Sequence, residues 1–109
     1  MHNELLEAFS QWIGEHSGSL AGNHIYVELA PVVKQTPKPG RYADFTDSNT
    51  RLFVGRVTLW SSGECNLEAS AMEDGSDFVG FFEQIVVQKA ADLERTLSQY
   101  IQRLKHQGK

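Results

Sequence analysis

The chain has 109 residues, of which 40 % are hydrophobic, and this is enough to build the one ordinary core of a single domain spanning residues 1–109. Its formal net charge of −4 argues against nucleic acid and anionic membranes as partners, because both would be repelled. The sequence has no run of about 18 apolar residues, and an acid stands at Glu4 where a signal peptide would carry bases, so we expect a cytoplasmic protein.

The first predicted element is an amphipathic helix that runs from Glu4 to about His16. Its apolar residues recur with the 3.6-residue period of one helix face. These residues are Leu5, Leu6, Phe9, Trp12 and Ile13. The pair Ser17-Gly18 follows the last of them and predicts the end of the helix.

A strand is predicted next, from about His24 to Ala30, where apolar residues alternate with others until Pro31 interrupts the pattern. The following stretch, Lys34 to Asn49, holds two prolines, a glycine and several turn-forming residues, and it shows neither the helical nor the strand period. We therefore predict a long exposed loop there. Loops of this length are uncommon in compact domains unless they are functional or mobile.

Three further strands are predicted at about Arg51–Trp60, Glu64–Met72 and Asp77–Val87. They are separated by Ser61-Ser62-Gly63 and by Asp74-Gly75, which are both typical of hairpin turns. These turns predict a register between the strands. Across the first turn the expected pairs are Leu59 with Cys65, Val57 with Leu67, Gly55 with Ala69, and Phe53 with Ala71. Across the second turn they are Ala71 with Phe78, Ala69 with Gly80, and Leu67 with Phe82.

The chain closes with a second amphipathic helix, predicted from about Lys89 to Lys105. Its apolar stripe consists of Leu93, Leu97, Tyr100, Ile101 and Leu104. Arg103 and Lys105 lie in the last turn, where cations interact favourably with the helix dipole.

The register places the small residues Gly55, Ala69 and Gly80 in one row on the apolar side of the sheet. A helix can approach closely over such a row. We therefore predict an α+β fold in which an antiparallel sheet of about four strands carries both helices on one face. In this register Arg56 lies directly opposite Glu68 on the other face. The other face is expected to carry Val54, Arg56, Thr58, Trp60, Asn66, Glu68, Ser70, Val79, Phe81 and Glu83.

Residue patterns typical of catalysis or metal binding are lacking. Cys65 alternates with apolar residues and has no predicted base beside it, so we interpret it as a buried, unreactive thiol. The four histidines lack metal-type spacing, and Asp44, Asp47 and Asn49 do not have the spacing of a calcium loop, so a turn explains them better. We expect no enzyme activity, no cofactor and no metal.

The acidic residues are concentrated in one region, which predicts a protein partner. Between residues 57 and 88 there are six acids and no Lys or Arg. The negative electrostatic field of these acids would steer a basic protein toward the chain. The alternative is that the acids are solvated residues that only keep the chain soluble. The candidate partner-binding residues are Tyr26, Glu28, Tyr42, Asp44, Phe45, Asp47, Arg56, Trp60, Glu64, Glu68, Phe81 and Glu83. The alternative is that the predicted loop, which contains Tyr42 and Phe45, folds back and covers the face of the sheet opposite the helices.

The run Gly55-Arg56-Val57-Thr58-Leu59-Trp60-Ser61-Ser62-Gly63-Glu64-Cys65, with the two strands and the helix that follow, resembles the TriTu family of bacterial immunity proteins. The resemblance covers about Arg51 to Leu104. It implies a cytoplasmic antidote to a polymorphic toxin that forms the C-terminal part of an Rhs effector delivered by type VI secretion. That toxin would be an ADP-ribosyltransferase that uses NAD to modify elongation factor Tu, whereas the antidote itself would not bind NAD. The alternative function is a secretion chaperone, which should be an obligate dimer and bind an extended segment of an effector.

Overall fold

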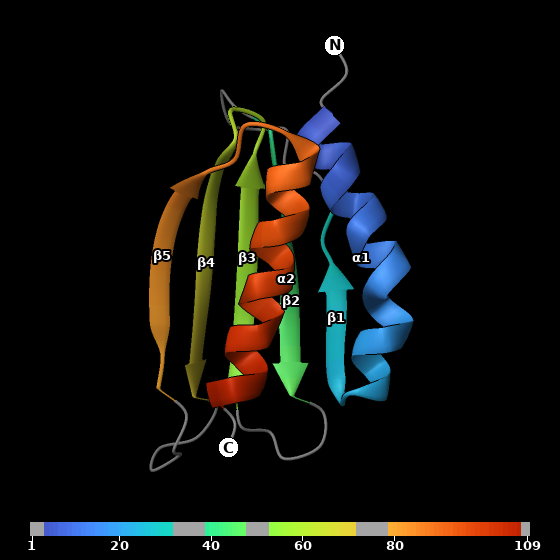
Figure 1. Ribbon diagram of the computed structural model, residues 1–109, viewed down its shortest axis with the longest axis vertical. Helices are drawn as coiled ribbons and strands as arrows, with labels where there is room; N and C mark the ends of the chain where they lie inside the picture. Colours follow the sequence, from blue (N-terminus) through green and yellow to red (C-terminus); the bar gives the residue numbers. More distant parts are fainter. Residues whose placement is uncertain (1–3, 32–38, 48–52, 72–78, 108–109) are drawn as a thin grey trace.

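The structure, a computed structural model, describes residues 4–31, 39–47, 53–71 and 79–107. These residues form a five-stranded antiparallel sheet with a helix at each end of the chain (Figure 1), so the α+β class is confirmed and the sheet has one strand more than expected. The strand order β1-β2-β3-β4-β5 follows the chain. The elements are α1 (Glu4–Gly22), β1 (Ile25–Leu29), β2 (Gly40–Asp47), β3 (Phe53–Trp60), β4 (Glu64–Ala71), β5 (Phe81–Val86) and α2 (Ala90–Gln107).

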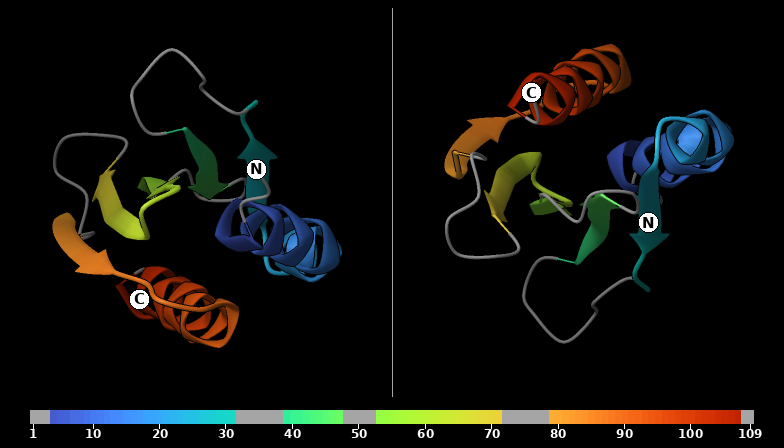
Figure 2. Two further views of the ribbon diagram at one scale, coloured as in Figure 1. Left: turned by 90° about the horizontal axis from the view of Figure 1, so that it is seen from above. Right: turned by 90° about the horizontal axis from the view of Figure 1, so that it is seen from below.

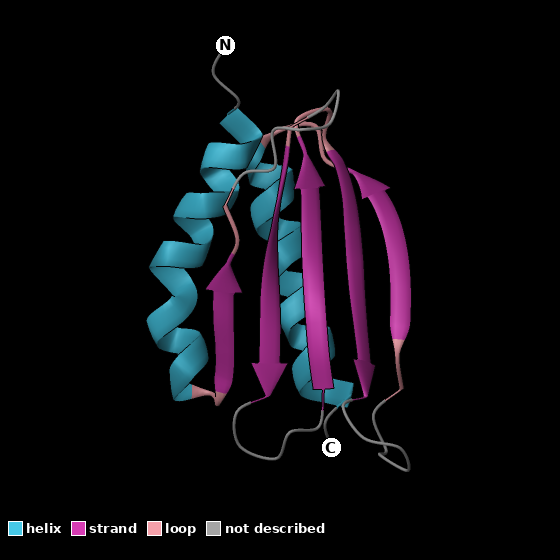
Figure 3. Cartoon of the chain, turned by 180° about the vertical axis from the view of Figure 1, so that it is seen from behind, coloured by secondary structure: helices cyan, strands magenta, loops and turns pink. Residues whose placement is uncertain are grey.

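Both helices pack on the same face of the sheet, as predicted. Seen along the strands in the left view of Figure 2, α1 and α2 both lie below the sheet. Seen from behind, the strands stand in front of α2, and α1 runs along the edge of the sheet next to β1 (Figure 3). We call the face without helices the outer face. It is the part of the described structure where side chains from all five strands are open to a partner.

The strand β2 is the element that the sequence analysis missed, because Gly40–Asp47 was predicted as part of an exposed loop. It pairs with β1 on one side and with β3 on the other. Ala43 and Phe45 point to the helix side and are fully buried, while Tyr42 and Asp44 lie on the outer face. The alternation was hard to detect because the inward positions include a small residue and the acid Asp47. The rest of the predicted loop, residues 34–38 and 48–49, lies outside the described residues.

The first predicted hairpin is confirmed pair by pair. Gly55 faces Ala69 and Arg56 faces Glu68, as the turn length required. The turn depends on Gly63, whose φ of +96° is in the region that glycine tolerates best. Its N–H donates to the carbonyl of Trp60 at 2.9 Å, and its carbonyl accepts from the N–H of Val87 at 2.8 Å. This turn therefore also anchors the chain between β5 and α2.

The second predicted register is wrong by one residue. Ala69 pairs with Phe81 and not with Gly80, and Leu67 pairs with Glu83 and not with Phe82. Because side chains alternate along a strand, this shift moves every residue of β5 to the opposite face. Phe81 packs against the core and Phe82 is exposed, the reverse of the prediction. The assumed turn and Phe78 lie outside the described residues.

The row of small residues does admit a helix, as predicted, but its third member is Phe81 instead of Gly80. Over this row the hydroxyl of Tyr100 in α2 donates a 2.7 Å hydrogen bond to the carbonyl of Glu68. A side chain at Gly55 would overlap with that hydroxyl, so glycine is required for the approach. The core around it is formed by both helices and the sheet, with Phe9, Phe45, Leu59, Leu93, Leu97 and Leu104 fully buried.

The first helix is longer than predicted, whereas the second agrees closely with its prediction. The structure carries α1 past Ser17-Gly18 to Gly22. The extra turn buries Leu20, which lies seven residues after Ile13 and so continues the same helix face. Gly18 does not end the helix, and a Cβ there would meet open space.

Candidate functional site

One row of outer-face residues crosses all five strands. In this row Glu28 of β1 faces Asp44 of β2, Asp44 faces Arg56 of β3, Arg56 faces Glu68 of β4, and Glu68 faces Phe82 of β5. We call these five residues the central row. It combines three acids, one base and one aromatic ring on a surface that no helix covers (Figure 3).

Arg56, the single base of the central row, is paired with Asp44 of the same row. Arg56 Nε donates to Asp44 Oδ1 at 2.6 Å and Nη2 donates to Oδ2 at 3.2 Å, which is a bidentate ion pair. The same guanidinium lies over the ring of Tyr42, with Cζ 4.0 Å from its centroid. The hydrogen bond to Asp44 is the largest effect on Arg56 and raises its pKa. The predicted opposition of Arg56 and Glu68 is confirmed, but the guanidinium bonds to Asp44, which lies on the strand that was missed.

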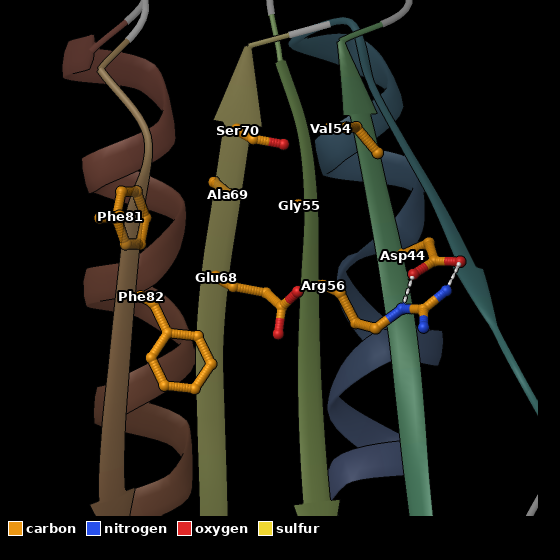
Figure 4. Close-up of a pocket in the computed structure, with 9 residues that line it drawn as sticks. All are labelled: Asp44, Val54, Gly55, Arg56, Glu68, Ala69, Ser70, Phe81 and Phe82. Carbon is orange, nitrogen blue, oxygen red and sulfur yellow. Dashed lines mark hydrogen bonds and ion pairs between the residues drawn. The ribbon is translucent and has the colours of Figure 1, made fainter.

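A groove of about 400 Å³ lies beside this ion pair, between β3 and β5 (Figure 4). The Asp44–Arg56 pair lies on the β3 side of the groove and the Phe82 ring lies on the β5 side, while the Glu68 side chain extends from β4 between them. Gly55 and Ala69 belong to the lining, but their Cβ positions face the helices, so they present only backbone to the groove. Phe82 is 62 % exposed, so most of its ring is open to solvent at the groove.

The comparison with protein-family models decides the family. The model described as immunity protein TriTu matches residues 7–103, which include every strand and most of both helices. The chain belongs to the TriTu family of immunity proteins. The resemblance noted for Arg51–Leu104 is thus confirmed and extends over the N-terminal helix. No curated protein and no solved structure matches the chain significantly.

A TriTu immunity protein has a cognate toxin as its partner, and the outer face gathers most of the residues predicted to bind one. The central row brings Glu28, Asp44, Arg56 and Glu68 together. Trp60 is half-buried because its indole covers Gly40 on the neighbouring strand. The predicted residues on this face are Tyr26, Glu28, Tyr42, Asp44, Arg56, Trp60, Glu64 and Glu68.

Four predicted residues of this TriTu protein lie elsewhere. Phe45 is fully buried and Asp47 is buried on the helix side of β2. Phe81 and Glu83 lie on the helix side of β5, as a result of the one-residue shift in register.

Phe81 and Glu83 hold α2 against the sheet instead of facing a partner. Arg103 of α2 places Cζ 3.7 Å from the centroid of the Phe81 ring, and its Nη1 donates to Glu83 Oε1 at 2.9 Å. The ring of Phe81 also meets Tyr100 edge to face, with centroids 6.0 Å apart. The outward position predicted for Phe81 belongs to Phe82, and only the observed register of β5 places Phe82 on the outer face.

The single thiol of this TriTu protein lies in the core. Cys65 is fully buried, and desolvation raises its pKa to about 12, so the thiol is neutral at physiological pH. Within the described ranges no group of three or more His, Cys, Asp or Glu side chains could hold a metal ion. In the same ranges no helix is long and apolar enough to cross a membrane.

Proposed function

We propose that this chain is a cytoplasmic antidote that binds a cognate antibacterial ADP-ribosyltransferase toxin through the outer face and thereby blocks it. Membership of the TriTu family supports the immunity role and a toxin partner. The proposed toxin class, an ADP-ribosyltransferase, comes from the resemblance of the run from Gly55 to Cys65 to the TriTu family. This resemblance implies the C-terminal domain of an Rhs effector, delivered by type VI secretion, that uses NAD to modify elongation factor Tu.

The observation that carries the proposal is the charge of a sheet face that no helix covers. Among the described residues, this face holds four carboxylates, of Glu28, Asp44, Glu64 and Glu68, against the one guanidinium of Arg56. Aromatic rings and an arginine lie among them, and these residue types are favoured at the centres of protein interfaces. A negative face of this kind attracts a basic protein surface.

The proposed mechanism is occlusion. A cleft that binds NAD must accommodate two phosphates, so it is expected to be electropositive. An acidic sheet face complements such a cleft, raises the rate of encounter and excludes the anionic cofactor once it is seated. In this mechanism the antidote contributes shape and charge, and none of its own side chains has to react.

The decisive test is protection of cells. The toxin domain is expected to be encoded by the neighbouring upstream gene, and its co-expression with this chain should restore growth. Failure of rescue despite good expression of the folded chain would overturn the proposal. Two variants locate the binding surface. Glu68→Lys reverses the charge of a half-exposed acid on the outer face, and Glu94→Lys does the same to an exposed acid on α2. We expect only Glu68→Lys to weaken toxin binding.

Trp60→Ala is a second probe of the same face, and it removes an aromatic surface without changing the charge. We expect Trp60→Ala and Glu68→Lys each to weaken toxin binding by more than about 1 kcal/mol while the chain remains folded. Unchanged affinity in both variants would show that the toxin binds elsewhere.

A further inference from the structure

The groove between β3 and β5 has an acidic and an aromatic wall, and we propose that it seats an arginine side chain of the toxin between Glu68 and Phe82. This inference rests on the proposed function, because it names the group that the outer face recognises. Two places in this molecule already hold an arginine with the same kinds of group.

The first such place is on the outer face itself. Tyr42 and Asp44 stand two residues apart on β2, so their side chains share one face. Arg56 stacks its guanidinium over the ring at 4.0 Å and bonds the carboxylate through two nitrogen atoms. An aromatic ring and a carboxylate together satisfy the flat face and the N–H groups of one arginine.

The second place is on the helix side of β5. Phe81 and Glu83 also stand two residues apart, and Arg103 of α2 lies over the ring at 3.7 Å while it donates to the carboxylate at 2.9 Å. The chemistry is that of Tyr42, Asp44 and Arg56, although the strand and the face are different. This sequence thus uses a ring and a carboxylate twice to hold an arginine.

Phe82 and Glu68 form a third set that has no arginine in the described part of the chain. They face each other directly across β4 and β5, so their Cβ atoms are closer than those of residues two apart on one strand. Figure 4 shows the Phe82 ring on the β5 side of Glu68, whose carboxylate extends away from the ring toward β3, so the space between ring and carboxylate is open. Among the described residues the Glu68 carboxylate forms no salt bridge: the guanidinium of Arg56, which stands opposite and feels its charge, is bound to Asp44.

The groove has room for such a guest. Its volume of about 400 Å³ opens over the backbone of Gly55 and Ala69, where no side chain projects outward. A guanidinium in this position would lie against the exposed ring of Phe82 and donate to Glu68. An anionic group would be repelled by the same carboxylate, and a lysine would lack the planar face that stacks on a ring. The groove therefore favours arginine.

The first experiment uses the isotope-labelled full chain and N-acetyl-arginine amide as the probe. Saturable NMR shifts confined to Arg56, Glu68, Ser70 and Phe82 are expected. N-acetyl-citrulline amide, which has a similar shape without the charge, should produce none. Glu68→Gln and Phe82→Leu should each reduce the affinity about tenfold or more, whereas the control Glu94→Gln should not. Equal shifts with both probes, or binding that is unchanged in Glu68→Gln, would overturn the inference.

The second experiment separates this inference from the proposed function. Binding of the toxin domain to the wild type and to Glu68→Gln and Phe82→Leu is measured by calorimetry. A loss of affinity of tenfold or more in both variants supports the arginine site. Tight toxin binding that neither variant changes overturns the site and leaves the proposed function standing. A chain that binds the arginine probe but neither binds the toxin domain nor rescues cells would refute the proposed function while the site itself stands.

Discussion

The hydroxyl of Tyr100 donates its hydrogen bond to the backbone carbonyl of Glu68, the residue whose side chain forms a wall of the outer-face groove. The two groups lie on opposite sides of β4, because Glu68 points its side chain to the outer face while α2 packs on the other. The hydrogen bond from α2 therefore holds the backbone of β4 in place at the residue that lines the groove. The packing of Tyr100 and the position of the Glu68 side chain are therefore linked through one residue.

The contact between Tyr100 and Gly55 can be tested by adding one methyl group. In Gly55→Ala the new Cβ would overlap with the Tyr100 hydroxyl and lie 3.1 Å from the Glu68 carbonyl. We expect the free energy of unfolding to fall by about 1–3 kcal/mol, because the ring must shift and its hydrogen bond is strained or lost. Chemical denaturation measures the change.

A double-mutant cycle shows whether the hydroxyl is the cause. Tyr100→Phe alone should cost about 1 kcal/mol through the lost hydrogen bond. When Gly55→Ala is added to the Tyr100→Phe variant it should cost less than it does in the wild type, since the overlapping oxygen is gone. Strictly additive losses would contradict this explanation.

The register of β5 is tested by two neighbouring phenylalanines. Phe81→Ala removes a ring that packs on Tyr100 and under Arg103, so we expect a loss of about 1–3 kcal/mol in the free energy of unfolding. Phe82→Ala removes an exposed ring and should change stability by less than about 0.5 kcal/mol while it weakens toxin binding. The reverse pattern would support the register predicted from the second turn.

Cys65 provides a prediction for alkaline pH. Its pKa is raised from the ordinary 9.0 to about 12 because the thiol is buried. The folded state therefore holds the proton more tightly than the unfolded state, and this contribution to stability is complete below pH 9.0 and is lost as the pH rises toward about 12. Cys65→Ala should reduce the loss of stability between these pH values, as urea titrations would show. An equal loss in both proteins would refute the assignment.

The charge of the outer face predicts a salt-dependent encounter with the toxin domain. Glu68→Lys should lower the association rate constant at low ionic strength, and the difference from the wild type should shrink as salt is added. Stopped-flow measurements at several salt concentrations, with Glu94→Lys as the matched control, test this.

Breaking the ion pair between Asp44 and Arg56 with Asp44→Asn should change the free energy of unfolding by less than about 1 kcal/mol, because both side chains are partly exposed.

The sequence predicted most of the fold where local chemistry determines the structure. The short turn at Gly63 set the pairing of β3 with β4 without error, because a tight turn leaves one register. The long segment before Phe81 does not fix a register in this way, so an error of one residue was enough to exchange Phe81 and Phe82. Tertiary packing decides that pairing, through Tyr100 and Arg103 of a helix that comes later in the chain.

The candidate site was predicted in part for the same reasons. Arg56 and Glu68 were found together because they belong to the well-determined hairpin. The true partner of Arg56 was not found, since Asp44 was assigned to a loop and only pairing on both sides reveals its strand. Phe45 and Asp47 were mistaken for surface residues for that reason, whereas Tyr26 and Glu28 followed correctly from the alternation in β1.

The position of both helices on one face has a consequence for how such an antidote can change over time. Side chains at Glu28, Tyr42 and Phe82 lie on the proposed binding face, and they are not part of the buried cluster that folds the chain. If the outer face binds the toxin as proposed, their replacement would alter the partner that is bound at little cost to folding. A lineage can therefore follow a toxin that changes its surface, keeping one scaffold while its outward strands acquire new specificities.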